Sequence, residues 1–246
     1  MKKHFGKKIA AASILCSIML MVLSCKSVKF DLDVYSPIAI LTVYSNPSLP
    51  WYDPQAKSSN AVDDSLPGTL LKKQNQENPE LYTVQERIDS AYKTLADSLS
   101  DSGINLIDST SFTGGEEYQK AAKVFLSSLE TDVPAEGLKV LDYINGKKYR
   151  QLAQSIGAEG IMLVEFNFYK QKLPVGMHDI FILARTTMNV YIYDAEGNKV
   201  FHKKYTAVSE TGPQDDNGSY NKHELIAKYS ETVESVVQSL VQDLHE

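Results

Sequence analysis

Apolar and polar positions alternate along this chain in patterns that predict a set of strands. Residues 37–44 are almost continuously apolar and rich in β-branched side chains, which favours a short buried strand over a helix. A second short apolar segment, at 104–108, predicts another strand. Three longer segments also predict strands, at 160–169, 180–193 and 199–208. The turn at 194–198 predicts that the last two strands form an antiparallel hairpin.

Apolar residues at helical spacing predict four amphipathic helices between these strands. The first helix begins at a capping box, Thr83 to Glu86, and Gly103 suits its C-terminal end. The apolar stripe of the last helix is the strongest. The four stripes lie at 84–99, 118–129, 145–155 and 225–244.

The predicted order is β-α-β-α-α-β-β-β-α. Each helix has one apolar stripe, so the helices should flank one mixed sheet of about five strands, an α/β fold. We expect a single α/β domain over 37–246. Five prolines between 45 and 80 prevent regular structure there, which predicts a long Pro-rich loop.

The N-terminus has the pattern of an export signal. Four lysines are followed by an uncharged apolar run from Ile9 to Leu23, which is short for a permanent membrane helix. The junction Val22-Leu23-Ser24-Cys25 resembles the bacterial lipobox. That resemblance implies cleavage between Ser24 and Cys25, acylation of Cys25, and a lipidated tether over 25–36. The alternative is an uncleaved N-terminal anchor helix.

Removal of the predicted signal peptide, residues 1–24, changes the composition. It takes away Cys16, four lysines and no acidic residue, which leaves one cysteine and 21 basic against 31 acidic side chains, a net charge of −10. No disulfide can then form within the mature chain. An acidic surface argues against nucleic acid as a partner. We expect the acyl chains on Cys25 to be the main membrane attachment.

Three later stretches resemble a group of periplasmic α/β domains found in the curli secretion lipoprotein CsgG, in LpoB and in the N-terminal domain of TolB. They are the opening strand 37–44, the helix-to-strand junction 152–163 and the hairpin 191–200. The resemblance implies a non-catalytic envelope lipoprotein that acts through protein contacts in envelope assembly or maintenance. Lys26 stands where an aspartate retains lipoproteins in the inner membrane of enteric bacteria, so the resemblance favours the outer membrane, on its periplasmic face.

No catalytic or metal-binding motif is evident in the sequence. The four histidines after the signal are widely separated, so we predict no metal, no cofactor and no catalytic residue. Glu165 lies between apolar neighbours in a predicted strand, but alternation favours a partly solvated position over a catalytic one. The alternative functions are an envelope or cell-wall enzyme with dispersed catalytic residues, and a subunit of a CsgG-like export pore. The oligomeric state stays open.

Trp51 and Tyr52 form the candidate partner-contact site. They are adjacent aromatic residues in a proline-flanked loop, which could anchor an envelope protein or cell-wall glycan at low entropic cost. The other interpretation is that Trp51 folds back to cover a sheet edge.

Overall fold

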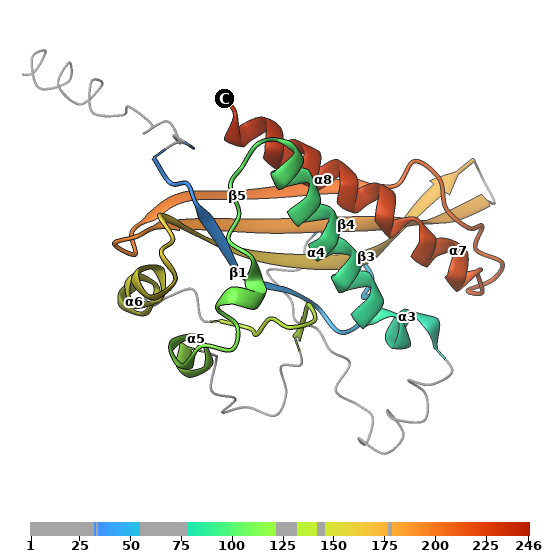
Figure 1. Ribbon diagram of the computed structural model, residues 1–246. Coiled ribbons are helices and arrows are strands. Elements are labelled where there is room, and N and C mark those ends of the chain that lie inside the picture. Colours follow the sequence, from blue (N-terminus) through green and yellow to red (C-terminus); the bar gives the residue numbers. More distant parts are fainter. Residues whose placement is uncertain (1–31, 33, 55–77, 122–131, 142–145, 177–178) are drawn as a thin grey trace, which may run out of the picture. The chain divides into compact units, whose positions relative to one another are not determined.

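The computed structural model describes residues 32, 34–54, 78–121, 132–141, 146–176 and 179–246, drawn in colour in Figure 1. They belong to a compact unit that extends from Asp31 to Glu246. The predicted signal peptide, with Ser24, as well as Cys25 and most of the predicted tether lie outside the described residues, as does 55–77 of the predicted loop. Those assignments therefore stay predictions.

One mixed sheet of five strands organises the protein, which confirms the predicted fold class. The strand order is β2-β1-β3-β4-β5. The central pair, β1 and β3, is parallel, and the other pairs are antiparallel. The strands are β1 (Ile38–Ser45), β2 (Val133–Pro134), β3 (Gly160–Val175), β4 (Asp179–Asp194) and β5 (Lys199–Val208).

The second strand along the chain differs from the prediction. Residues 104–108 make only one parallel bridge, between Ile38 and Leu106. The chain then turns away because Asp108 caps a 3-10 helix, Ser109–Ser111, through its side chain. The place of a fifth strand is taken by β2, whose Pro134 suits the sheet edge because proline has no N–H to donate.

Two long helices cover one face of the sheet, α4 (Val84–Asp101) and α8 (Tyr229–Leu244), which run side by side in Figure 1. The short helices α3 (Pro79–Tyr82) and α7 (Lys222–Ala227) precede them. Alternate residues of β3 face this layer: the ring of Phe168 meets the edge of the Tyr229 ring at 5.3 Å. Thr186 of β4 and Thr232 of α8 join the layers by a buried hydroxyl hydrogen bond of 2.6 Å.

The other face of the sheet is covered at one end by α5 (Glu116–Ala121) and α6 (Gly146–Ile156). Of the predicted helix at 118–129, the part beyond Ala121 lies outside the described residues up to 131. Tyr118 is buried here, and its hydroxyl donates to the Leu41 carbonyl at 2.8 Å. The apolar cluster on this face includes Leu41, Tyr118, Tyr149, Leu152, Ile161 and Leu163.

The hairpin of β3 and β4 is longer than the sequence predicted. The two strands stay in register from Gly160–Asp194 to Val175–Asp179, so β3 continues six residues past Tyr169. The hairpin at 194–198 is confirmed: the Asp194 side chain accepts from the Asn198 N–H at 2.7 Å, and Gly197 has a φ of 82°. Within the described residues, no helix is both long and apolar enough to cross a membrane.

Candidate partner-contact site

The segment that carries Trp51 is fixed to the edge of β3. The Lys170 N–H donates to the Pro50 carbonyl at 2.9 Å, and the Tyr52 N–H donates to the Lys170 carbonyl at 2.8 Å. Pro50 has no N–H, so a longer ladder cannot form there, and Trp51 makes a single bridge with Lys170. The local sequence therefore places a short extended segment, and not a full strand, beside β3.

Asn46 secures the start of this segment. Its side-chain amide pairs with both backbone groups of Phe168: Nδ2 donates to the Phe168 carbonyl and Oδ1 accepts from the Phe168 N–H, each at 2.9 Å. The same Nδ2 also donates to the Ser48 carbonyl at 2.6 Å. Just after β1 ends at Ser45, the Asn46 side chain therefore makes the pair of hydrogen bonds to β3 that the backbone of a neighbouring strand would make. Leu49 is buried and anchors the loop.

Trp51 lies beside the sheet edge and yet keeps 45% of its surface exposed. The ammonium groups of Lys170 and Lys172 each lie 5.0 Å from the centre of its ring, within cation–π range. The Tyr220 ring meets it edge-on at 6.3 Å. We call Trp51, Lys170, Lys172 and Tyr220 the Trp51 surface. The sequence left two interpretations of Trp51, a cover for a sheet edge and a partner contact. Its side chain packs on the sheet edge, and its exposed part remains available for a partner.

A buried ion pair lies beneath the Trp51 surface. Lys170 Nζ is 2.8 Å from Glu80 Oε2, and the two side chains are only 12% and 7% exposed. The Tyr220 hydroxyl donates to the other carboxylate oxygen of Glu80. Glu80 belongs to α3, where Asn78 caps the helix and also accepts from Lys222 at 3.1 Å. The network therefore ties α3, β3 and the chain just before α7 to one carboxylate.

The two sequence-predicted aromatic residues do not share a surface. Successive side chains of an extended segment point to opposite faces. Tyr52 accordingly packs on the other face of the sheet, with its ring 3.7 Å from the Arg185 guanidinium carbon and 6.0 Å from the Tyr169 ring. Trp51 faces Tyr220. A partner that contacts Trp51 would therefore meet Lys172 beside it, and not Tyr52.

Sequence reasoning missed Lys170, Lys172 and Tyr220, and Lys172 is the exposed cation among them. Its side chain is 51% exposed and lies 3.6 Å from Asp215. The alternation of β3 carries the signal, because Phe168, Lys170 and Lys172 lie on one face, but the sequence predicted that the strand ended at Tyr169. The extra length of β3 therefore supplies the cationic part of the Trp51 surface.

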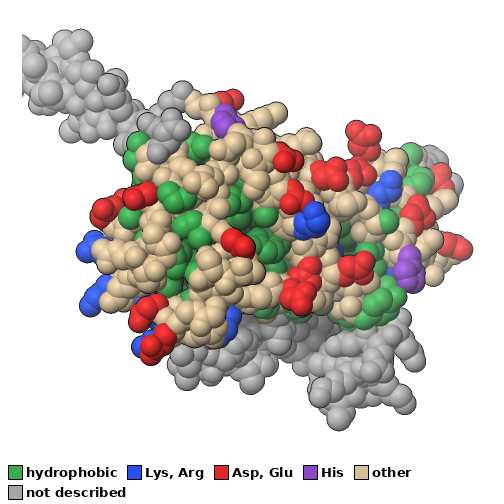
Figure 2. Space-filling view, viewed as in Figure 1, with side chains coloured by type: hydrophobic (Ala, Val, Ile, Leu, Met, Phe, Trp, Pro, Cys, Tyr) green, Lys and Arg blue, Asp and Glu red, His purple; other side chains and the backbone are tan. Residues whose placement is uncertain are grey.

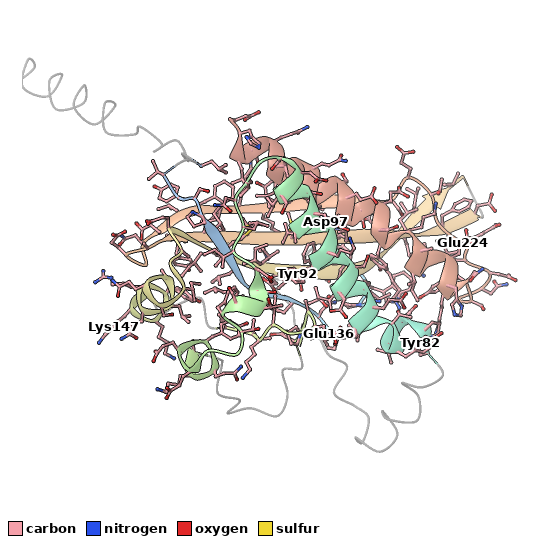
Figure 3. The ribbon with its side chains drawn as sticks, viewed as in Figure 1. Tyr82, Tyr92, Asp97, Glu136, Lys147 and Glu224 are labelled. Carbon is pink, nitrogen blue, oxygen red and sulfur yellow. The ribbon has the colours of Figure 1, made fainter. Side chains whose placement is uncertain are left out.

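Acidic side chains outnumber basic ones in the chain, 31 against 25. Figure 2 shows several of them on the face formed by α4 and α8. Figure 3 places Tyr82 at the α3 end of the protein and Lys147, on α6, at the opposite end. The Tyr82 hydroxyl is 3.1 Å from His223 Nε2.

Glu165, the candidate for an enzymatic role, is half-buried on the face opposite Phe166. Its two carboxylate oxygens accept from the side-chain amides of Asn167 and Asn189, each at 2.9 Å. Elsewhere in the chain, residues 215–218 form a turn, in which Asp215 Oδ1 accepts from the Gly218 N–H at 2.8 Å. Within the described part of the chain, no group of three or more histidine, cysteine or acidic residues is placed to hold a metal ion.

The histidines of the described residues do not converge on one site either. His202 stacks on Tyr191 with ring centres 4.2 Å apart, and burial followed by the nearby Lys199 lowers its pKa. His223 contacts Tyr82 at the other end of the sheet. His178 lies outside the described residues.

Comparisons with known proteins give distant likenesses only. No family model and no curated protein matches the chain. Among solved structures it is similar to a minor lipoprotein from Acinetobacter baumannii, with 13% identity and a TM-score of 0.35, over 63% of this chain and 83% of that one. It is also similar to lipoprotein GNA1162 from Neisseria meningitidis, with 11% identity and a TM-score of 0.33, over 85% and 99% of the two chains.

A third likeness is to the LpoB C-terminal domain from Salmonella enterica, with 10% identity and a TM-score of 0.22, over 70% of this chain and 87% of that one. Two of these three proteins are named as lipoproteins. The membership of the CsgG, LpoB and TolB group that the sequence suggests stays a prediction.

The hydrogen bond from Tyr220 to Glu80 generates a pH-dependent prediction. Burial, and then the hydrogen bond to Glu80, raises the pKa of Tyr220 above its ordinary value. A raised folded-state pKa gives stability that is complete below the ordinary tyrosine pKa of about 10 and is lost as the pH rises above it. Tyr220→Phe should therefore lower the free energy of unfolding by about 1 kcal/mol at neutral pH and reduce its alkaline decline.

Urea unfolding across the alkaline range measures both effects. Tyr82→Phe is the matched control, because Tyr82 is exposed, and its change should stay within about 0.5 kcal/mol. Equal alkaline slopes for wild type and Tyr220→Phe would show that the Tyr220 hydroxyl is not held by Glu80.

Proposed function

We propose that this protein is a non-catalytic, lipid-anchored lipoprotein of the cell envelope that binds an envelope protein through the Trp51 surface. One observation carries the binding part of the proposal: Trp51 is half-exposed although its backbone is fixed to β3 on both sides. A large aromatic side chain held this way loses little entropy on binding, and tryptophan is enriched among the residues that dominate interfaces.

The charged side chains around Trp51 indicate which chemical groups the partner presents. Lys170 forms a shielded ion pair with Glu80, and Lys172, whose side chain is half-exposed, forms a longer ion pair with Asp215 at 3.6 Å. An acidic group on the partner can approach Lys172 while an apolar group packs on the indole. We therefore expect a partner segment that presents an apolar side chain next to a carboxylate.

The enzymatic alternative has less support. It requires a pocket that holds Glu165 or a histidine. The cavity between α4 and α8 is lined by neither, and the Glu165 carboxylate is occupied by two asparagine amides. The export-pore alternative has a separate test: single-channel conductance of the purified protein would favour it.

Lipid anchoring rests on the sequence around Cys25 and has a direct test. Cys25→Ser should abolish labelling of the protein by radioactive palmitate in growing cells, and it should release the protein from the membrane fraction. The reason is that the thiol is the acceptor of the lipid in the lipobox that residues 22–25 resemble. Cys16→Ser is the matched control and should leave labelling intact, because Cys16 belongs to the removed signal. Persistent labelling of Cys25→Ser would refute the anchor.

Partner binding is tested by a photo-crosslinking amino acid placed at position 51, at position 172, or at position 147 as the control. Lys147 is an exposed lysine at the far end of the protein (Figure 3). Crosslinks to one envelope protein should form from positions 51 and 172 and not from 147. The variant Lys172→Glu should reduce the yield from position 51 severalfold, because it repels an acidic partner. Equal crosslinking from all three positions would contradict the proposed site.

A further inference from the structure

The strand β5 forms one edge of the sheet. In the order β2-β1-β3-β4-β5 it pairs with β4 alone, and it lies at the side of the sheet opposite β2 (Figure 1). β5 is ten residues long, whereas the other edge strand, β2, has two residues. The outer side of an edge strand carries N–H and C=O groups that no strand of its own sheet pairs. β5 is therefore the long edge of the described sheet.

The hydrogen bonds to β4 determine which residues of β5 face outward. The Ser209 N–H donates to the Ala184 carbonyl at 2.8 Å, and the Ala184 N–H donates to Ser209 Oγ at 3.0 Å, so both backbone groups of Ala184 point toward β5. Backbone groups alternate in direction along an antiparallel strand. In the register that pairs Met188 with Tyr205, the odd-numbered residues of β5 therefore bond β4. The even-numbered residues point their N–H and C=O groups away from the sheet: His202, Lys204 and Thr206.

These outward backbone groups have no hydrogen-bond partner among the residues that the structure describes. His202, Lys204 and Thr206 are all exposed, and their N–H and C=O groups bond to no described part of the chain. Each residue supplies one donor and one acceptor, in the alternating spacing that a neighbouring antiparallel strand requires. The edge is therefore long enough to pair with an added strand through several backbone hydrogen bonds.

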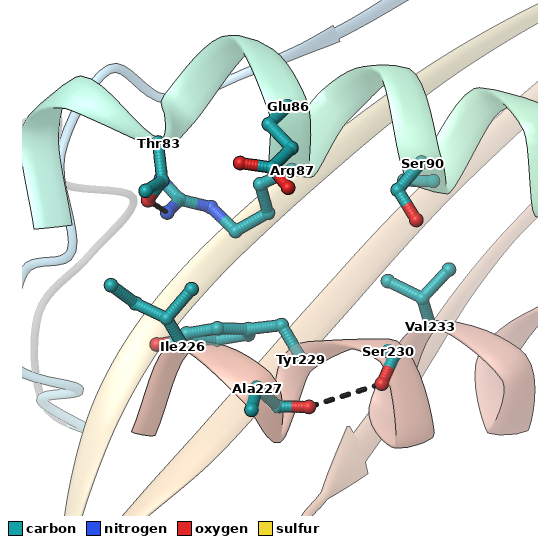
Figure 4. A pocket seen from close by; sticks show the side chains of 10 residues that line it. Thr83, Glu86, Arg87, Ser90, Ile226, Ala227, Tyr229, Ser230 and Val233 are labelled. Carbon is teal, nitrogen blue, oxygen red and sulfur yellow. Dashed lines mark hydrogen bonds between the residues drawn. The ribbon is translucent and has the colours of Figure 1, made fainter. Parts of the chain in front are cut away.

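The helix α8 covers a face of β5 and holds the strand without using its outer edge. α8 packs over β4 and β5. Its first half lines a cavity with α4, shown in Figure 4, and its last turn brings Asp243 to β5. There Asp243 forms an ion pair with Lys203 and accepts from the Tyr205 hydroxyl at 2.7 Å. Lys203 and Tyr205 are odd-numbered residues, so these contacts leave the outward backbone groups unused.

The side chains of β5 are basic, unlike the chain as a whole. β5 contains three lysines, one histidine and no acidic residue, in a chain with a net charge of −6. Lys203 is paired with Asp243, but Lys199 and Lys204 are exposed and form no ion pair with a described residue. Lys199 lies over the Tyr191 ring, on the face of the sheet away from α8, and the alternation of β5 places Lys204 on that face as well. The charge at this edge therefore favours a partner strand with carboxylates on one face.

We infer that the outer edge of β5 binds an acidic, extended segment of a partner protein, which adds to the sheet as a further strand. The backbone of that segment bonds the outward groups of β5, and its carboxylates lie beside Lys199 and Lys204. A second copy of this chain is disfavoured as the occupant, because pairing two β5 strands brings the three lysines of one copy against those of the other. β3 and β4 separate this edge from the Trp51 surface, so the inference does not depend on the proposed function.

Backbone amide exchange, measured by NMR on the full chain in detergent micelles, tests the added strand residue by residue. The probe is the peptide acetyl-Thr-Glu-Val-Glu-Val-Glu-Thr-amide at about 1 mM, whose glutamates share one face of a strand. It should slow exchange of the Lys204 and Thr206 N–H groups about tenfold or more, because each gains an acceptor. The Lys203 and Tyr205 N–H groups already bond β4 and are internal controls. Unchanged exchange at Lys204 and Thr206 would overturn the proposal, as would their protection in a free chain that is dimeric, which assigns the edge to a second copy.

A charge exchange tests the chemistry of the partner. The same peptide with lysine in place of glutamate should bind wild type about tenfold more weakly or worse. Lys199→Glu combined with Lys204→Glu should reverse this preference, a gain for the lysine peptide that misfolding cannot produce. Lys172→Glu, at the Trp51 surface, is the matched control and should leave the preference unchanged, because charges farther apart than the screening length interact weakly. An unreversed preference in the double variant would contradict an acidic partner strand.

A proline tests the backbone pairing. Thr206→Pro removes an outward N–H and leaves the bonds to β4 in place, so it should abolish the slowed exchange at Lys204. Thr206→Val keeps the N–H and is the matched control, which should bind the glutamate peptide as wild type does. Undiminished binding by Thr206→Pro would show that the peptide does not add to β5 as a strand.

Discussion

The buried ion pair between Glu80 and Lys170 is the interaction on which the Trp51 surface depends. Lys170 belongs to β3 and lies under Trp51, while Glu80 belongs to α3 and also accepts from Tyr220. The desolvation of two charges costs several kcal/mol, and a pair offsets this only when its other hydrogen bonds are met. Here Tyr220 meets the second oxygen of Glu80, so the pair holds one arrangement of α3, β3 and the chain before α7.

The same pair explains how Trp51 is positioned. Lys170 contributes backbone bonds on both sides of the Trp51 segment and an ammonium group over its ring. Lys170 and Tyr220 occupy both oxygens of Glu80. One carboxylate thus stabilises the Trp51 surface.

The sequence predicted the sheet and its flanking helices because the spacing of apolar residues follows from which positions are buried. In α8, for example, the predicted apolar stripe of Val233, Val236 and Leu240 is buried. The sequence did not predict β2 or the end of β3, where pairing follows neighbours distant in sequence, such as Tyr44 with Pro134. It selected Trp51 from composition, but its separation from Tyr52 depends on the backbone pairing with Lys170.

A double-mutant cycle on Glu80 and Lys170 tests the central claim most directly. The free energy of unfolding is measured for wild type, Glu80→Gln, Lys170→Met and the double variant. Each single variant leaves a buried charge without its partner and should lose about 3 kcal/mol, whereas the double variant should regain much of that loss. The account predicts a coupling energy above about 1 kcal/mol. Additive losses, with no coupling, would contradict the claim that this pair organises the protein.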